Sequence, residues 1–305
     1  MEFGKLENIQ SVDWSLPATD PASVKYLNGL MPFEGKTEFR IGTPAWGRPE
    51  WVKTIYPPKT PANQFLHFYA KNFGCIELNT VHYRIPTAEQ LKKWIEKVTP
   101  GFIFCPKIFN GISHSLEGLQ DLALIKSWCE TLPHYGEHLG PCFLQLPPTF
   151  DYSKKAALFQ FLRAWPDEFE LAIEFRHPSW LTPSRQILPA LGDYLRQRGI
   201  GLVLLDVAGR RDLLHTSISA PFTMLRFIGN DLDPSDFARS KTWAEKFLQW
   251  QEQGLERAYF FVHEPDDIKA PEMADQVVQD LNETCGADLS GMTWFSVENP
   301  QAQLF

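Results

Sequence analysis

Several features of secreted, membrane-bound and nucleic-acid-coating proteins are missing from this sequence. Its five cysteines are odd in number and no two form a CxxC pair, which favours free thiols in a reducing compartment over a disulfide framework. The first residues hold no apolar stretch, and no window approaches the length of a membrane span. Lysine and arginine, at 29, are outnumbered by 37 aspartates and glutamates, whereas general nucleic-acid and membrane-surface binders are usually basic. We therefore expect a cytoplasmic protein with no membrane partner and no general affinity for nucleic acid.

Apolar and aromatic side chains are abundant instead. Of the 305 residues, 44% are hydrophobic, and the 10 tryptophans, 8 tyrosines and 23 phenylalanines argue against disorder. A chain of this length can bury a large core without disulfides or a structural metal.

Short apolar runs of strand length alternate with longer stretches of helical periodicity along the middle of the chain. After Thr87 the apolar residues recur at helical spacing, and Pro189 predicts a late start or a kink in a later helix. The stretch after Val207 has room for a short helix at most. The expected strands are 39–46, 75–80, 102–107, 141–147, 170–177, 201–207, 222–229 and 258–264.

This alternation predicts an α/β fold with a parallel sheet. Eight units in about 245 residues match a TIM-type (β/α)8 barrel in size, with one degenerate unit after strand 6. A doubly wound open sheet is the alternative, but GTPAWG after the first run is not the GxGxxG typical of that fold. We assign residues 39–284 to the barrel domain, 1–38 to an N-terminal extension and 285–305 to a C-terminal tail.

Charged residues fall on the inner positions of several expected strands. In ELAIEFRH the outward set is apolar, so Glu174 and Arg176 point inward, and the same alternation turns Glu77 and Asn79 inward. All lie near the carboxyl ends of their strands, where TIM-barrel active sites are found. Because an isolated buried charge is costly, these groups must pair or face an open mouth. A ring of ion pairs that only plugs the barrel is the structural alternative.

Three cations on three strands of an acidic protein suggest an anionic ligand. Lys107 is on the inward-facing set of positions of its strand, together with Ile103 and Cys105. The pattern of the strand that holds Arg226 does not fix the direction of this side chain. Together with Arg176 they would hold a phosphate or carboxylate. Glu77 and Glu174 beside them are candidates for a general acid or base.

Four segments, IGTPAW, IELNTVHYRIP, LGPCFLQLPPTF and LAIEFRHPSW, follow one another in this order. On these segments residues 39–284 resemble the YecE-like family, also called domain of unknown function 72. The resemblance implies a TIM barrel and brings no proven activity. The positions that match the family's pattern are Trp46, Glu77, Asn79, Tyr83, Lys107, His114, Gln145, Glu174, Arg176, His177, Trp180, Asp206 and Arg226.

Two places depart from the pattern of the family. The family's Thr-His pair after the third strand reads Ser113–His114 here. In the eighth strand, many members have an aromatic residue followed by Asn-Asn, and this chain has Val262–His263–Glu264–Pro265. The change replaces two amides by a titratable pair, which puts in doubt any role that needs the amides.

A divalent metal site is one competing interpretation. The candidate ligands are four histidines and three carboxylates: His82, His114, His177, His263, Glu77, Glu174 and Asp206. No HxH or HExxH spacing accompanies them, and no cofactor motif is present. The sequence therefore favours a site without metal or cofactor.

Covalent catalysis is the other competing interpretation. No GxSxG occurs, and Cys75 and Cys105 lie deep in their strands, where cysteine acts as a small hydrophobe. A desolvated Lys107 among other cations would have a lowered pKa and could form an imine. An anion-binding or ion-paired lysine is the simpler reading.

These observations predict an uncharacterised YecE-like enzyme of hydrolase, lyase or isomerase type with a small anionic or polar substrate. The catalytic candidates are Glu77, Glu174 and Asp206. The substrate-binding candidates are Trp46, Asn79, Tyr83, Lys107, His114, Gln145, Arg176, Trp180, Arg226 and His263.

The last five residues suggest an alternative function. QAQLF is similar to the short peptide by which bacterial polymerases and repair proteins dock on the sliding clamp, with Gln301, Leu304 and Phe305 filling the pockets. The alternative is a repair-associated or non-catalytic binding protein. A match of three specified residue types within five residues also arises by coincidence, and we favour coincidence as the explanation here.

Overall fold

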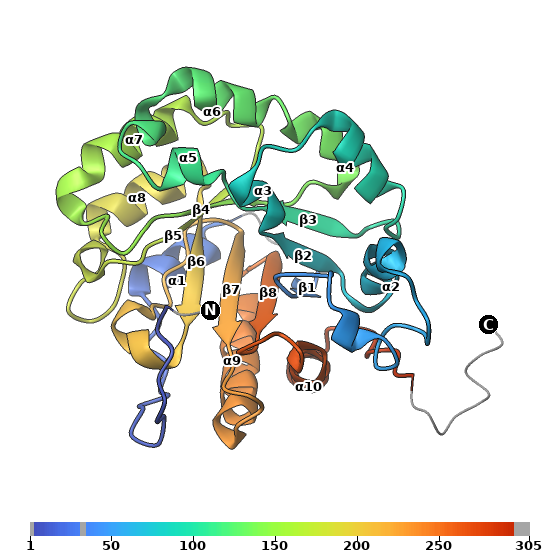
Figure 1. The fold of residues 1–305 in the computed structure, drawn as a ribbon. Coiled ribbons are helices and arrows are strands. Elements are labelled where there is room, and N and C mark those ends of the chain that lie inside the picture. The colour runs from blue at the N-terminus through green and yellow to red at the C-terminus, as the bar shows by residue number, and fades with distance from the viewer. Residues whose placement is uncertain (1–2, 31–34, 296–305) are drawn as a thin grey trace.

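The computed structural model describes residues 3–30 and 35–295. Within these ranges, eight strands alternate with helices along the chain, and the helices lie outside the strands (Figure 1). The strands are β1 (Glu38–Gly42), β2 (Cys75–Leu78), β3 (Ile103–Pro106), β4 (Cys142–Gln145), β5 (Leu171–Glu174), β6 (Gly201–Asp206), β7 (Phe222–Ile228) and β8 (Arg257–His263). Each falls within, or within one residue of, the run expected from the sequence.

All strand pairs are parallel, and they form two sheets. Six strands pair in the order β1-β8-β7-β6-β5-β4, and β2 pairs with β3. Backbone hydrogen bonds run between the sheets at both edges: Gly74 N donates to Ile41 O at 3.1 Å beside β1, and Ile108 N donates to Phe143 O at 3.0 Å beside β4. This mixed α/β arrangement is consistent with a TIM-like barrel.

Local sequence signals explain where several helices begin. The Thr87 hydroxyl accepts from Gln90 N at 3.2 Å and caps α4. Pro189 occupies the first turn of α8, where its missing N–H costs no hydrogen bond, so the expected late start is confirmed. The helices are α1 (Pro21–Asn28), α2 (Phe65–Asn72), α3 (Thr80–Tyr83), α4 (Ala88–Ile95), α5 (Asn110–Ser113), α6 (Leu122–Cys129), α7 (Lys155–Ala164), α8 (Pro189–Arg198), α9 (Pro234–Glu252) and α10 (Ala270–Cys285).

Side-chain alternation separates two apolar clusters. Ile76 and Leu78 of β2 belong to the cluster shared with the helices, where burial of each such side chain contributes roughly 1.5–3 kcal/mol. Cys105, Phe143 and Met224 belong to a second cluster on the inner face of the strands. Toward the carboxyl ends, the inner positions turn polar, and this is the region that we call the rim.

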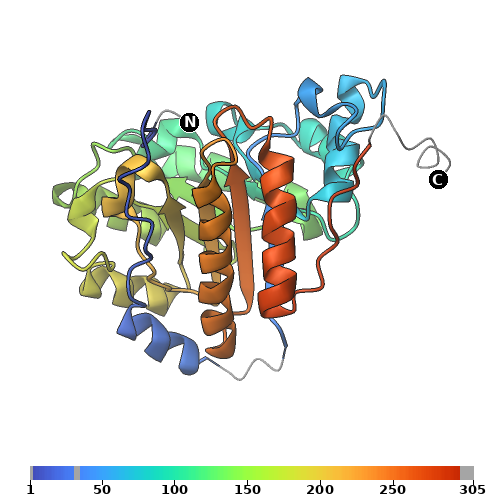
Figure 2. The ribbon, with the colours of Figure 1, turned by 90° about the horizontal axis from the view of Figure 1, so that it is seen from below.

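The unit after β6 lacks an α-helix, as the sequence predicts. Only a 3-10 helix, Ala208–Leu213, follows the strand. The N-terminal segment packs here instead: Gly209 N donates to Gly4 O at 2.8 Å, and the Lys246 ammonium on α9 donates to the Thr19 hydroxyl at 2.9 Å. Figure 2 shows this segment, in dark blue, running alongside α9. The extension therefore covers the gap left by the missing helix.

None of the helices in the described ranges has the length and apolarity that crossing a membrane would require.

Candidate active site at the carboxyl ends of the strands

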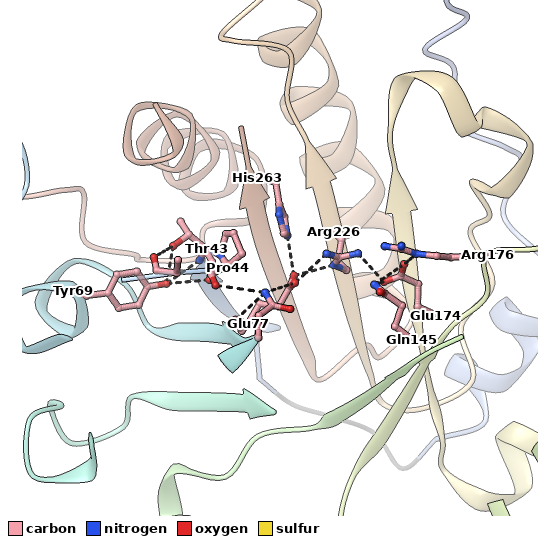
Figure 3. A network of polar contacts seen from close by, with 11 residues as sticks. Thr43, Pro44, Tyr69, Glu77, Gln145, Glu174, Arg176, Arg226 and His263 are labelled. Carbon is pink, nitrogen blue, oxygen red and sulfur yellow. Dashed lines mark hydrogen bonds and ion pairs between the residues drawn. The ribbon is translucent and has the colours of Figure 1, made fainter. Parts of the chain in front are cut away.

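A buried arginine joins two glutamates from different strands (Figure 3). Arg226 of β7 donates from Nε to Glu77 Oε2 at 2.8 Å and from Nη2 to Glu77 Oε1 at 3.0 Å. Its Nη1 donates to Glu174 Oε2 at 2.9 Å. The two carboxylates are fully buried and Arg226 is 2% exposed. The inward direction of Arg226, which its own strand left open, is thus set by partners on β2 and β5.

Glu77 has both carboxylate oxygens occupied by donors. Besides Arg226, His263 Nε2 lies 2.8 Å from Oε2, and Asn79 Nδ2 donates to Oε1 at 2.9 Å. Burial alone would raise the pKa of Glu77, but the charges and hydrogen bonds of Arg226 and His263 hold it well below the usual range. Glu77 therefore stays ionised at neutral pH.

Glu174 is saturated in the same way. Gln145 Nε2 donates to Oε1 at 3.1 Å and to Oε2 at 3.0 Å, and Arg176 Nε donates to Oε1. Burial opposes ionisation, but Arg176 and Arg226 outweigh it and lower the pKa of Glu174 to about 2. The alternation of β5, read from the sequence, placed both Glu174 and Arg176 on this side.

Lys107 adds a third cation to the rim. It follows β3, its side chain is 8% exposed, and its ammonium forms no hydrogen bond or ion pair with the described part of the chain. Burial and the nearby Arg226 lower the pKa of Lys107 to about 8, against the opposing influence of Glu77 and Glu174. An amine with such a pKa can gain or lose a proton near neutral pH.

Trp46 and Asn79 lie beside Glu77, as expected. A cavity of about 240 Å³ is lined by residues 44–47 after β1 and 76–80 around the end of β2, and these three residues are among them. The Trp46 ring packs edge-on against Trp94 at 5.5 Å between centroids. Asn79 also donates to Pro44 O at 3.4 Å, which connects the loop after β1 to the end of β2.

The remaining rim candidates, Tyr83 and His114, lie on or next to the short helices α3 and α5 that follow β2 and β3. Tyr83 on α3 is 72% exposed. The ring of His114 lies 5.1 Å from the ring of His82, whose Nδ1 is 2.6 Å from Ile108 O. Burial and the charge of Lys107 lower the pKa of His82 to about 4, and the same two causes lower that of His114. Both imidazoles are therefore neutral beside Lys107.

Asp206 lies outside this group, so its predicted position at the mouth is wrong. Its Oδ2 accepts from Trp243 Nε1 of α9 at 2.7 Å, and Arg239 Nη1 lies 3.2 Å from Oδ1. Asp206 shares the outward parity of Leu202 and Leu204, which belong to the cluster shared with the helices. Because β6 is apolar on both faces, its pattern did not make this direction obvious.

Trp180 does not wall a pocket either. Its side chain is fully buried, its ring stacks on Phe150 with 5.9 Å between centroids, and Nε1 donates to Phe150 O at 2.7 Å. The tryptophan fastens the loop after β5 to the loop after β4, so its proximity in sequence to Arg176 reflects packing.

Other residues singled out in the sequence contribute differently. Glu264 is buried, with Oε2 accepting from Asp231 N at 2.8 Å, and burial together with Asp236 raises its pKa to about 8. Burial raises the pKa of the Cys75 and Cys105 thiols, which makes them poor nucleophiles.

The metal hypothesis and the C-terminal peptide stand differently against the described residues. Within residues 3–30 and 35–295, His, Cys, Asp and Glu form no group of three or more that could hold a metal ion. Gln301, Leu304 and Phe305 lie outside the described residues, so the sliding-clamp hypothesis stays a prediction.

The guanidinium of Arg176 has an aromatic neighbour that the sequence did not indicate. The Phe3 ring lies with its centroid 4.4 Å from Arg176 Cζ. No periodicity or motif in the N-terminal segment points to this contact, because it depends on how the extension packs after β6.

Comparisons with known proteins agree with the resemblance seen in the sequence. A family model described as "Protein of unknown function DUF72" matches residues 40–293. The chain is 31% identical over 262 residues to UPF0759 protein YecE of Escherichia coli (strain K12), which covers 80% of this chain and 93% of that protein. It is 28% identical over 150 residues to UPF0759 protein YunF of Bacillus subtilis (strain 168), over 47% of this chain and 52% of that protein. The expected YecE-like relationship is confirmed.

Solved structures are similar in fold. A DUF72 family protein from Thermotoga maritima MSB8 aligns with a TM-score of 0.65 at 22% identity, over 80% of this chain and 99% of that one. A DUF72 family protein from Enterococcus faecalis V583 aligns with a TM-score of 0.64 at 20% identity, over 81% and 98%. At these identities the likeness concerns the fold alone.

Proposed function

This chain belongs to the DUF72 family, whose description states no function, and we propose that its rim is the active site of an enzyme that binds a small anionic substrate and transfers a proton. The proposal includes closure of the eight strands into one (β/α)8 barrel. Hydrogen bonds between the two sheets and the Glu77–Arg226–Glu174 connection across strands support it.

The charge balance of the rim carries the proposal. Two ionised glutamates face Arg176, Arg226 and, below a pH of about 8, the Lys107 ammonium. Arg226 and Arg176 are paired with these glutamates, whereas the Lys107 ammonium has no ion-pair partner among the described residues, and a buried cation without such a partner favours an anion. A plug made only of ion pairs would give Lys107 a carboxylate partner, so the lack of one among the described residues argues for a ligand.

Lys107 is the group that we propose to exchange a proton with the substrate. Glu77 and Glu174 were the sequence-based candidates, but their oxygens are filled by donors and their pKa values are lowered. A carboxylate held this far below neutrality is a weak base and does not donate a proton at pH 7. The two glutamates instead hold Arg226 and Arg176 in place and keep the local potential from rising further.

The neighbouring polar groups give the substrate an orientation. Asn79 and Trp46 line the cavity beside Glu77, and His114 stands near Lys107 as a neutral imidazole. Such an arrangement suits proton transfer during hydrolysis, elimination or isomerisation of an anionic compound.

Sulfate binding tests the proposed site, because sulfate keeps its charge from pH 6 to 10. We expect Lys107→Met to weaken sulfate binding by about tenfold, the loss of one buried charge-assisted contact. Lys92→Met, on the exposed face of α4, is the matched control and should leave binding unchanged. Calorimetric titration at constant ionic strength measures both, and equal affinity in the two variants would count against the proposal.

A further inference from the structure

The N-terminal segment reaches the rim with its first described residues. Gly4 has a φ of +76°, and a Cβ there would lie 2.9 Å from Val207 Cγ2, so glycine permits the close approach to the chain after β6. Phe3 packs against the small apolar cluster of Leu205, Val207, Leu213 and Ile228. The extension is thus anchored at the carboxyl ends of β6 and β7, next to the cations of the rim.

Phe3 lies against Arg176, which is the more exposed of the two rim arginines, Arg176 and Arg226. The ring centroid lies 4.4 Å from Arg176 Cζ and 5.0 Å from Arg210 Cζ. The side chain of Arg176 is 11% exposed, and its Nε donates to Glu174. An aromatic ring attracts the guanidinium through its face, whereas carboxylates and phosphates are recognised by the N–H groups in the guanidinium plane.

We propose that Phe3 is a positioning residue: it holds the Arg176 guanidinium in an orientation in which this group can bind an anion at the rim. This role rests on the proposed anion site. The Arg176 guanidinium lies over the Phe3 ring and its Nε donates to Glu174, so contacts from distant parts of the chain restrict its orientation. A fixed orientation reduces the conformational entropy that Arg176 would otherwise lose when the anion binds.

A second contact of the same kind lies away from the rim and serves as a control. The Trp14 ring lies 4.4 Å from Arg239 Cζ and 5.2 Å from Arg211 Cζ. Arg211 also donates to Asp13 O and Ser15 O, at 3.1 and 3.3 Å. Trp14 therefore fastens the same segment to α9 and to the 3-10 helix after β6, next to the partners of Asp206.

Sulfate titrations of single variants separate the two roles. We expect Phe3→Leu to weaken sulfate binding by about fivefold, because leucine keeps the apolar packing and loses the attraction to the guanidinium. Phe3→Trp should bind sulfate like the unaltered protein. Trp14→Leu should lower the melting temperature and leave the affinity for sulfate unchanged.

A double-variant cycle tests whether Phe3 acts through Arg176. In an Arg176→Met background, Phe3→Leu should have no further effect on sulfate affinity, because the group that it positions is gone. Equal affinity of the unaltered protein and Phe3→Leu, or a full fivefold loss in the Arg176→Met background, would overturn the role of Phe3 and leave the anion site standing. Failure of the unaltered protein to bind sulfate would instead overturn the anion site, and the positioning role with it.

Discussion

Two buried clusters of carboxylates and arginines lie on different sides of the strands, one centred on β2, β5 and β7 and the other between β6 and α9. The inner cluster joins Glu77 and Glu174 to Arg226 and Arg176. The outer cluster joins Asp206 and Asp236 to Arg239, with Arg211 beside Asp206, and Trp243 donates to Asp206 at 2.7 Å. The two resemble each other in chemistry but differ in what surrounds them.

The outer cluster is balanced and closed. Two aspartates face two arginines, and Arg239 lies between the Trp14 ring at 4.4 Å and the Phe227 ring at 4.1 Å. The inner cluster has the Lys107 ammonium nearby in addition, and its Glu77 lines a cavity of about 240 Å³. The comparison teaches that buried ion pairs alone do not indicate a site: we base our proposal for the rim on Lys107, which has no ion-pair partner among the described residues, and on the cavity beside Glu77.

The strongest way to test this difference is to remove the central arginine of each cluster. Arg226→Met and Arg239→Met each leave buried carboxylates without their main partner, so each should lower the free energy of unfolding by roughly 3–5 kcal/mol. Only Arg226→Met should also abolish sulfate binding. Urea unfolding and sulfate titration measure the two effects, and loss of binding in Arg239→Met would erase the distinction between the clusters.

Acid unfolding sharpens the comparison through Glu174. Its pKa in the folded protein is lowered from 4.5 to about 2, so the ionised form contributes about 3 kcal/mol of stability above pH 4.5, which is lost as the pH falls toward 2. In Glu174→Gln this contribution should be absent. Unfolding curves of the two proteins should therefore differ most at neutral pH and converge near pH 2; a constant difference over the whole range would contradict the lowered pKa.

Anion binding should depend on pH at the rim because of Lys107. The groups that face this lysine are the carboxylates of Glu77 and Glu174, the guanidinium groups of Arg176 and Arg226, and the imidazoles of His82 and His114, whose pKa values are lowered. With a pKa of about 8, the ammonium is mostly protonated at pH 7 and mostly deprotonated at pH 9, so sulfate affinity should be about fivefold lower at pH 9 than at pH 7. Lys107→Met should show a flat profile, and an equally steep one would assign the titration to another group.

The smallest effect is expected at the amino ends of the strands. Arg257 of β8 pairs with Glu170, but the two side chains are 26% and 40% exposed, so solvent weakens the interaction. Glu170→Gln should change the free energy of unfolding by less than about 1 kcal/mol and leave sulfate binding unaltered. A larger loss would show that exposure is a poor guide to the strength of these pairs.

The alternation of side chains explains why most of the rim could be predicted. In β2 and β5, apolar residues on one set of positions leave Glu77 and Glu174 only the inner face. In β6 both sets of positions are apolar up to Asp206, so the sequence did not show which set faces outward. The structure places Leu202 and Leu204 against the helices, and Asp206 is on the same set of positions. Where a pattern is uniform, parity has to come from the partners in space.

Two residues show a different limit of sequence reasoning. Trp180 was expected at the mouth because it follows Arg176 closely, yet its indole is buried against Phe150. Phe3 was missed because its contact with Arg176 joins parts of the chain 173 positions apart. Both outcomes depend on how loops pack over the ends of the strands, which no local periodicity records.

Location of a bound anion tests the central claim most directly. Crystals grown with selenate, which has the shape and charge of sulfate, would reveal the anion by the anomalous scattering of selenium. Our account predicts selenate at the rim, within hydrogen-bond distance of Lys107 Nζ and the Arg176 guanidinium. A rim without selenate at a concentration that saturates the binding measured in solution would contradict it.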